Sequence, residues 1–136
     1  KSSSYFSPER LAIVWNPFGG VEWKGKIQSP AIVLVHEESH AEHFLDNPKQ
    51  YQLDSNPELS PDAVYDNIEE RKAQTTANRV AIRLKVKEPQ IFTHSIGSSL
   101  VTVSGPTSNK VQGVNNNILL NNQILQKKEG STSERR

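Results

Sequence analysis

Two histidines four residues apart, His36 and His40, stand in the middle of a long stretch without a helix breaker. The stretch covers residues 31–45 and follows Ser29-Pro30. A serine before a proline is typical of a helix start, because proline fits the first helical position and the serine precedes it as the cap. The first half of the stretch is apolar all round, which for a helix indicates burial on nearly every side. We therefore expect a helix at the centre of the domain.

The five residues 36–40 read HEESH and fit the pattern HExxH. Residues four apart stack on one helical face, so both imidazoles can reach one Zn²⁺ while Glu37 between them acts as general base on a water. A buried helix with two histidines and a glutamate in its middle needs a partner for them, and a metal is one. The competing interpretation is a helix that becomes polar toward its end and exposes these side chains.

A third metal ligand must be His, Asp or Glu, because the chain has no cysteine. A second serine-proline pair at residues 60–61 predicts a helix from there to about Lys85. Glu70 is the preferred ligand, because it falls on the apolar stripe of that helix, which consists of Glu70, Ala73, Ala77, Val80, Ala81 and Leu84. Glu69, expected to share a face with Lys72, is a supporting residue, or the ligand itself if the phase of the helix differs by one residue.

His94 lies in a predicted loop between the second helix and a strand at residues 100–103. Zinc hydrolases need a hydrogen-bond donor near the developing oxyanion, so we assign His94 this catalytic role. A loop histidine bonded to backbone is an equal alternative, and Tyr65 and Arg71 are weaker candidates for the same role. His43 is interpreted as a flanking residue rather than a metal ligand.

The composition excludes several classes of function. The 136 residues suffice for one domain, and 34% hydrophobic residues indicate an ordered core smaller than the chain. A net charge of +1 gives no general attraction to nucleic acid or to an anionic membrane. No apolar run approaches the length needed to cross a bilayer, so no membrane insertion is expected. The absence of methionine suggests a piece released from a longer polypeptide.

Changes of composition divide the chain into three parts. Residues 1–9 are polar and rich in serine, which predicts a poorly ordered segment. Residues 10–108 form the expected domain, with a strand at 10–16, a strand or loop at 21–27 and a surface loop at 47–59. Residues 109–136 are rich in asparagine and charge, which predicts a largely flexible tail whose few apolar residues dock on the domain or on a partner.

Taken together, these motifs resemble the zinc-metallopeptidase toxin domains at the C-termini of Rhs-repeat polymorphic toxins. Those domains are similar in turn to type III effector zinc proteases, and more distantly to clostridial neurotoxin light chains. The resemblance covers about residues 10–108 and rests on the segments 28–41, 65–72, 93–94 and 104–108. It implies an α+β fold, a minimal zincin-like domain whose two long helices carry the metal site and pack on a small, mainly antiparallel sheet. It also implies that His36 and His40 are ligands, that Glu37 is the base, and that the third ligand comes from the pair Glu69-Glu70.

The resulting expectation is a zinc-dependent endopeptidase, a bacterial toxin or effector domain secreted or injected into a target cell, where it cleaves a protein. The implied partners are Zn²⁺, the protein substrate and a cognate immunity or carrier protein, without nucleic acid. A strand at the edge of the sheet, for which residues 10–16 are the candidate, would hold the substrate extended. The alternative is a degenerate metallopeptidase-like module that binds a partner protein and keeps zinc in a structural role.

Overall fold

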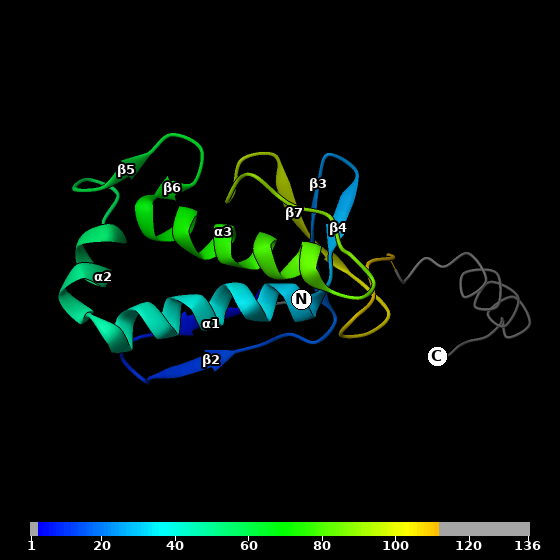
Figure 1. The fold of residues 1–136 in the computed structure, drawn as a ribbon, viewed down its shortest axis with the longest axis horizontal. Coiled ribbons are helices and arrows are strands. Elements are labelled where there is room, and N and C mark those ends of the chain that lie inside the picture. Colours follow the sequence, from blue (N-terminus) through cyan, green and yellow to red (C-terminus); the bar gives the residue numbers. More distant parts are fainter. Residues whose placement is uncertain (1–2, 112–136) are drawn as a thin grey trace, which may run out of the picture.

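The computed structural model describes residues 3–111 and shows an α+β fold. Two long helices, α1 (Pro30–Asp46) and α3 (Ile68–Arg83), lie side by side, and the short α2 (Pro48–Asp54) lies at one end of them (Figure 1). The described strands are β1 (Tyr5–Ser7), β2 (Ala12–Val14), β3 (Gly19–Trp23), β4 (Lys26–Gln28), β5 (Pro61–Asp62), β6 (Asp66–Asn67) and β7 (Ser98–Thr102). Within these residues no helix has both the length and the hydropathy needed to cross a membrane.

All the described sheets are antiparallel. The three-stranded sheet has the order β4-β3-β7, with Val21 of β3 opposite Leu100 of β7. β1 pairs with β2, and β5 pairs with β6. The strand predicted at residues 100–103 is thus confirmed with slightly different bounds, as β7. The strand predicted at 10–16 is shorter and pairs with β1, in a sheet separate from β3.

Helix α1 begins where the sequence predicts, at Pro30 after Ser29. The side chain of Ser29 makes no capping bond; instead its hydroxyl and amide both donate to the carboxylate of Glu88, at 2.6 and 2.8 Å. The helix contacts α2, α3 and four strands, so it is central as expected. The prediction of burial on nearly every side is wrong, because Ile32 is buried whereas Ala31 and residues 33–35 are half-buried.

The start of α3 differs from its predicted position. Residues 61–67 form the β5–β6 hairpin instead of helix, and α3 begins at Ile68. Asn67 is the cap, because its side-chain oxygen accepts a hydrogen bond from the amide of Glu70 at 2.9 Å. The hairpin is held to the helix by Arg71, which donates to Asp62 and lies 4.5 Å from the ring of Tyr65. The serine-proline pair at 60–61 therefore opens a strand.

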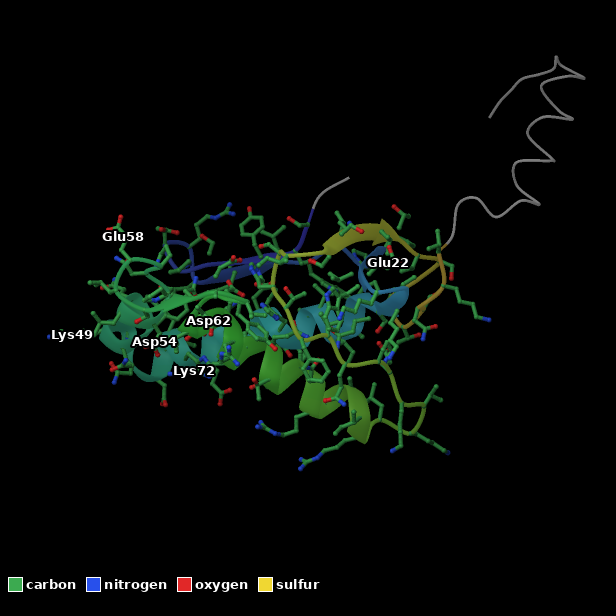
Figure 2. The ribbon with its side chains drawn as sticks, turned by 90° about the horizontal axis from the view of Figure 1, so that it is seen from above. Glu22, Lys49, Asp54, Glu58, Asp62 and Lys72 are labelled. Carbon is green, nitrogen blue, oxygen red and sulfur yellow. The ribbon has the colours of Figure 1, made fainter. Side chains whose placement is uncertain are left out.

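Two further segments are more regular than the sequence predicts. The expected surface loop 47–59 contains α2, capped by the side chain of Asn47, and Lys72 of α3 forms an ion pair with Asp54 of α2 at 2.5 Å (Figure 2). The expected poorly ordered segment 1–9 contains β1, because Phe6 packs against the rings of Phe44 and Tyr51. The predicted docking of the C-terminal tail concerns residues that lie outside the described part of the chain.

The core between the helices consists of one isoleucine and two alanines. Ile32 of α1 packs with Ala77 and Ala81 of α3, and all three are fully buried. Alanines allow a close approach of the two helices, so the side chains that follow on the same faces meet across the interface. Those side chains are the histidines of α1 and the acidic residues at the start of α3.

Candidate metal centre

Side chains from α1 and α3 converge on one point. His36 and His40 turn their Nε2 atoms to the same side of α1, 3.2 Å apart. The Oε1 atom of Glu70 lies 2.9 Å from Nε2 of His36 and 3.1 Å from Nε2 of His40. A tetrahedral zinc site with ligand distances of about 2.0–2.1 Å has ligand-to-ligand edges of about 3.3–3.4 Å. The three atoms are therefore spaced almost as one face of such a tetrahedron.

A third histidine reaches the same carboxylate from the loop before β7. Nε2 of His94 lies 3.2 Å from Oε1 of Glu70, and its ring stacks on that of His36 with 5.9 Å between centroids. His36, Glu70 and His94 each offer a ligand atom within 4.8 Å of the other two, a group that could hold a metal ion. The loop therefore brings His94 to the site. Its side chain contacts other side chains, whereas the alternative interpretation was a loop histidine bonded to backbone.

The tautomer of His36 follows from a chain of buried amides that starts at the backbone of Ile91. The amide of Ile91 donates to Oδ1 of Asn78 at 2.9 Å, and Nδ2 of Asn78 donates to the Ile91 carbonyl at 2.8 Å, which fixes the orientation of Asn78. Its Oδ1 is thus an acceptor, so the Gln74 atom 3.0 Å away is Nε2. Oε1 of Gln74 then accepts from Nδ1 of His36 at 2.9 Å. A neutral His36 consequently has its lone pair on Nε2.

Carboxylates hold the other two imidazoles in the same way. Nδ1 of His40 donates to Oε2 of Glu69 at 2.9 Å, and Nδ1 of His94 donates to Oδ2 of Asp66 at 2.6 Å. Hydrogen bonding of the remote ring nitrogen is the usual support of a metal-bound histidine, because it fixes the tautomer and the ring orientation. Each of the three rings therefore directs Nε2 toward Glu70.

This arrangement requires positive charge at its centre. Three Nε2 lone pairs and one carboxylate oxygen would face one another, so either protons or a cation must lie between them. Burial lowers the pKa of His40, but its hydrogen bonds to Glu69 and Glu70 outweigh burial and raise the pKa to about 10. For Glu70, burial acts to raise the pKa, and the hydrogen bonds from His36 and His40 hold it far below its ordinary value. The donor set, imidazole nitrogen with carboxylate oxygen, is one that suits Zn²⁺.

Asp66 has an unusual backbone conformation beside the site. Its φ is 76°, a positive value that few residues other than glycine, asparagine and aspartate adopt readily. Its carboxylate accepts from Nδ1 of His94, and the hydroxyl of Ser95 donates to the same oxygen at 2.8 Å. Thr93 joins the two segments further by donating to the carbonyl of Val64 at 3.3 Å. The β5–β6 hairpin thus holds the loop that carries His94.

Glu37 faces a cavity next to these side chains. The cavity has a volume of about 230 Å³ and is bordered by His36, Glu37 and His94, with residues of β3 and β7 opposite. Burial raises the pKa of Glu37, although the nearby His36 and His40 act to lower it. A carboxylate with a raised pKa at the wall of a cavity is suited to accept and return a proton.

The acidic pair at the start of α3 departs from the expected phase. Glu69, predicted on the outer face, is 1% exposed and continues the row of Ala73, Ala77 and Ala81. Glu70 begins a second, polar row with Gln74 and Asn78. Ala73, Ala77 and Ala81 are thus buried as predicted, and Glu70 lies among the three histidines, but the outer position predicted for Glu69 is wrong, because it lies behind His40.

The remaining candidates lie elsewhere. Nδ1 of His43 donates to Glu69 at 2.7 Å, so His43 contacts Glu69 rather than Glu70. Tyr65 and Arg71 contact each other and the hairpin, so neither faces the cavity. Sequence reasoning missed Gln74, Asn78 and Asp66; the spacing of four between Glu70, Gln74 and Asn78 was the available signal for two of them.

Comparison of the chain with protein-family models, with curated proteins and with solved structures finds no match. The function must therefore be argued from the geometry of the centre and from its chemistry.

Proposed function

We propose that the protein is a zinc-dependent endopeptidase whose metal is held by His36, His40 and Glu70. The observation that carries the proposal is the convergence of these three ligand atoms within 3.2 Å of one another, with Glu37 at the adjacent cavity. Two histidines and a glutamate are the ligand set of known zinc peptidases. The resemblance to toxin domains of Rhs-repeat proteins supports a secreted or injected toxin or effector that acts on a protein of the target cell.

The residues have distinct roles in peptide hydrolysis. Zinc, when bound, supplies Lewis acidity that polarises a carbonyl and lowers the pKa of a water to about 7. Glu37 accepts the proton of the attacking water and delivers it to the leaving amine, which its raised pKa favours. His94, oriented by Asp66, donates from Nε2 to the oxygen that gains negative charge. Donation from Nε2 while Nδ1 donates to Asp66 requires a proton on both ring nitrogens of His94.

An extended substrate can be held by β7. This strand is the outer member of the β4-β3-β7 sheet, and its residues Ser98 and Leu100 border the cavity beside Glu37. An outer strand offers backbone groups for a peptide to add as a further strand. The candidate strand at residues 10–16 is less suited, because β2 lies in another sheet and none of its residues borders this cavity.

The test of this function is Glu37→Gln beside the exposed neighbour Glu38→Gln. The amide preserves the shape of Glu37 but cannot accept the proton, so cleavage of fluorescently labelled casein should fall at least about 100-fold. Bound zinc, measured by elemental analysis, should remain at one per chain in both variants. Glu38→Gln should retain wild-type cleavage. Undiminished cleavage by Glu37→Gln would contradict the peptidase mechanism.

The second candidate is a zinc-stabilised binding module, and the position of His94 favours it. A fourth protein ligand would close the coordination sphere, as in structural zinc sites, and leave no position for water. His94→Gln distinguishes the two functions. In a structural site this variant should lose much of its zinc affinity and thermal stability, whereas in the peptidase it should lose activity and keep the metal.

A further inference from the structure

We propose that the cavity beside Glu37 binds an uncharged, aliphatic side chain of the substrate next to the scissile bond. This inference rests on the proposed peptidase function and adds a substrate class to it. The cavity lies on the side of α1 that carries Glu37 and His36, so a bond attacked there places a neighbouring residue of the substrate at its entrance.

Four aliphatic residues from different parts of the chain form the apolar part of the walls. Val21 and Leu100 are opposite one another on β3 and β7 and both border the cavity, so they lie on the same face of the sheet. Val33 lies one helical turn before Glu37, and Ile91 lies in the segment after α3. The side chains of Val21, Val33 and Leu100 are only half-buried, so an apolar group in the cavity would cover surface now in contact with water.

The two amide side chains in the wall, those of Gln28 and Gln74, offer little to a charged ligand. Gln28 donates from Nε2 to Asn78 at 3.0 Å and to the carbonyl of Pro89 at 2.9 Å, and its Oε1 accepts from Gln74 at 3.2 Å. Gln74 is bound in turn to His36 and Asn78. The amide groups are therefore engaged with one another and are not free for a ligand.

The charge and the size of the cavity agree with this class. Among residues 3–111, no lysine or arginine borders it, and Glu37 is the only carboxylate that does. An acidic side chain would meet Glu37 without a compensating cation, and a basic one would compete for the carboxylate needed as the base. Its volume of about 230 Å³ is below the roughly 300–1,000 Å³ of sites for drug-sized ligands, which suits a single side chain.

The experiment uses internally quenched peptide libraries in which one position at a time carries Leu, Asp or Lys. Wild-type protein loaded with zinc should cleave peptides with Leu at one position next to the scissile bond at least about 10-fold faster than those with Asp or Lys. Leu100→Arg places a cation in the wall and should shift this preference toward Asp. Leu100→Ala enlarges the cavity without adding charge and should raise the rate for Phe relative to Leu, which keeps the proposal testable if the arginine variant fails to fold.

Leu45→Arg is the matched control, because Leu45 is an exposed leucine of α1 that does not border the cavity. It should leave the preference unchanged. Equal cleavage of Leu, Asp and Lys peptides by a protein that still requires Glu37 would overturn the aliphatic subsite and leave the peptidase function standing. An unchanged preference in both Leu100 variants would overturn it as well. Absence of cleavage of every peptide, in wild type and in Glu37→Gln alike, would refute the proposed function and the subsite with it.

Discussion

Helix α1, packed on α3, and the loop before β7, held by the β5–β6 hairpin, bring histidines to Glu70 by different means. His36 and His40 are placed by the pitch of α1 and by its tight packing against the alanines of α3. His94 lies on a loop, and its position depends on polar contacts with the β5–β6 hairpin, chiefly that with Asp66. Packing places the first two histidines, whereas a few hydrogen bonds place the third.

The difference suggests a division of tasks. Metal ligands need fixed geometry, which a helix with a buried face provides. A group that donates to a transient charge must fit the substrate as well, and a loop held by polar contacts allows this adjustment. Changes in the helical region should therefore act mainly on metal binding, and changes in the loop region mainly on turnover.

The largest effect is expected from His36→Ala. This variant removes a proposed ligand and leaves Gln74 and Glu70 without their partner, so stoichiometric zinc should be lost. The control is His43→Ala on the same helix, which removes a side chain that contacts Glu69 but not Glu70. Elemental analysis after dialysis checks both variants. Undiminished zinc in His36→Ala would show that His36 is not a metal ligand.

The second-largest effect is expected from Glu70→Gln, and its comparison with Glu69→Gln distinguishes the ligand from the supporting residue on α3. Glu70→Gln should lower zinc affinity by more than about 100-fold, because the amide is a poor substitute for a ligating carboxylate. Glu69→Gln should lower it by about 10- to 100-fold, the range typical of residues that orient a ligand. Competition with a chelating dye gives both affinities. If Glu69→Gln has the larger effect, the ligand is Glu69 and the carboxylate seen among the histidines is a supporting one.

The helical region could be predicted from the sequence because its signals are local. A spacing of four residues specifies one face of a helix wherever the helix lies, so the HExxH pattern needed no knowledge of the rest of the fold. The phase of α3 was predicted less well, because two adjacent rows are buried on it. The apolar row leads to Glu69 and the polar row leads to Glu70, and hydropathy alone detects only the first.

The loop region could not be predicted, because its contacts join residues far apart in the sequence. Asp66 and His94 are 28 positions apart, and no local pattern relates them. In the same region the cap signals predicted the wrong start of the second helix. Ser60-Pro61 resembles Ser29-Pro30, yet it opens a strand, and α3 is capped by Asn67 without a proline. Which of several acceptable caps is used is decided by tertiary packing.

A smaller effect, confined to turnover, is expected from Asp66→Asn. Asparagine tolerates the positive φ and still accepts a hydrogen bond from His94, but it lacks the charge. The turnover rate on labelled casein should fall about 10- to 100-fold, with KM and zinc affinity close to wild type. Ser95→Ala, which removes one bond to the same carboxylate, should have a weaker effect in the same direction. A fall in zinc affinity instead would assign His94 to the metal ligands.

The smallest effect is expected from Asp62→Asn, which weakens the attachment of the hairpin to α3 without touching the site. Arg71 holds the pKa of Asp62 at about 2, below its value in an unfolded chain. A carboxylate whose pKa is lowered by folding stabilises the protein above its unfolded pKa of about 3.9, and this contribution is lost as the pH falls toward 2. Wild type should therefore be the more stable of the two at pH 6, and thermal unfolding measured between pH 6 and pH 2 should show the two melting temperatures converging as the pH falls. Zinc affinity should change by about twofold or less, because the ion pair is formed with Arg71 and not with His36, His40 or Glu70. A large loss of turnover in Asp62→Asn would show that the position of His94 depends on the whole hairpin and not on Asp66 alone.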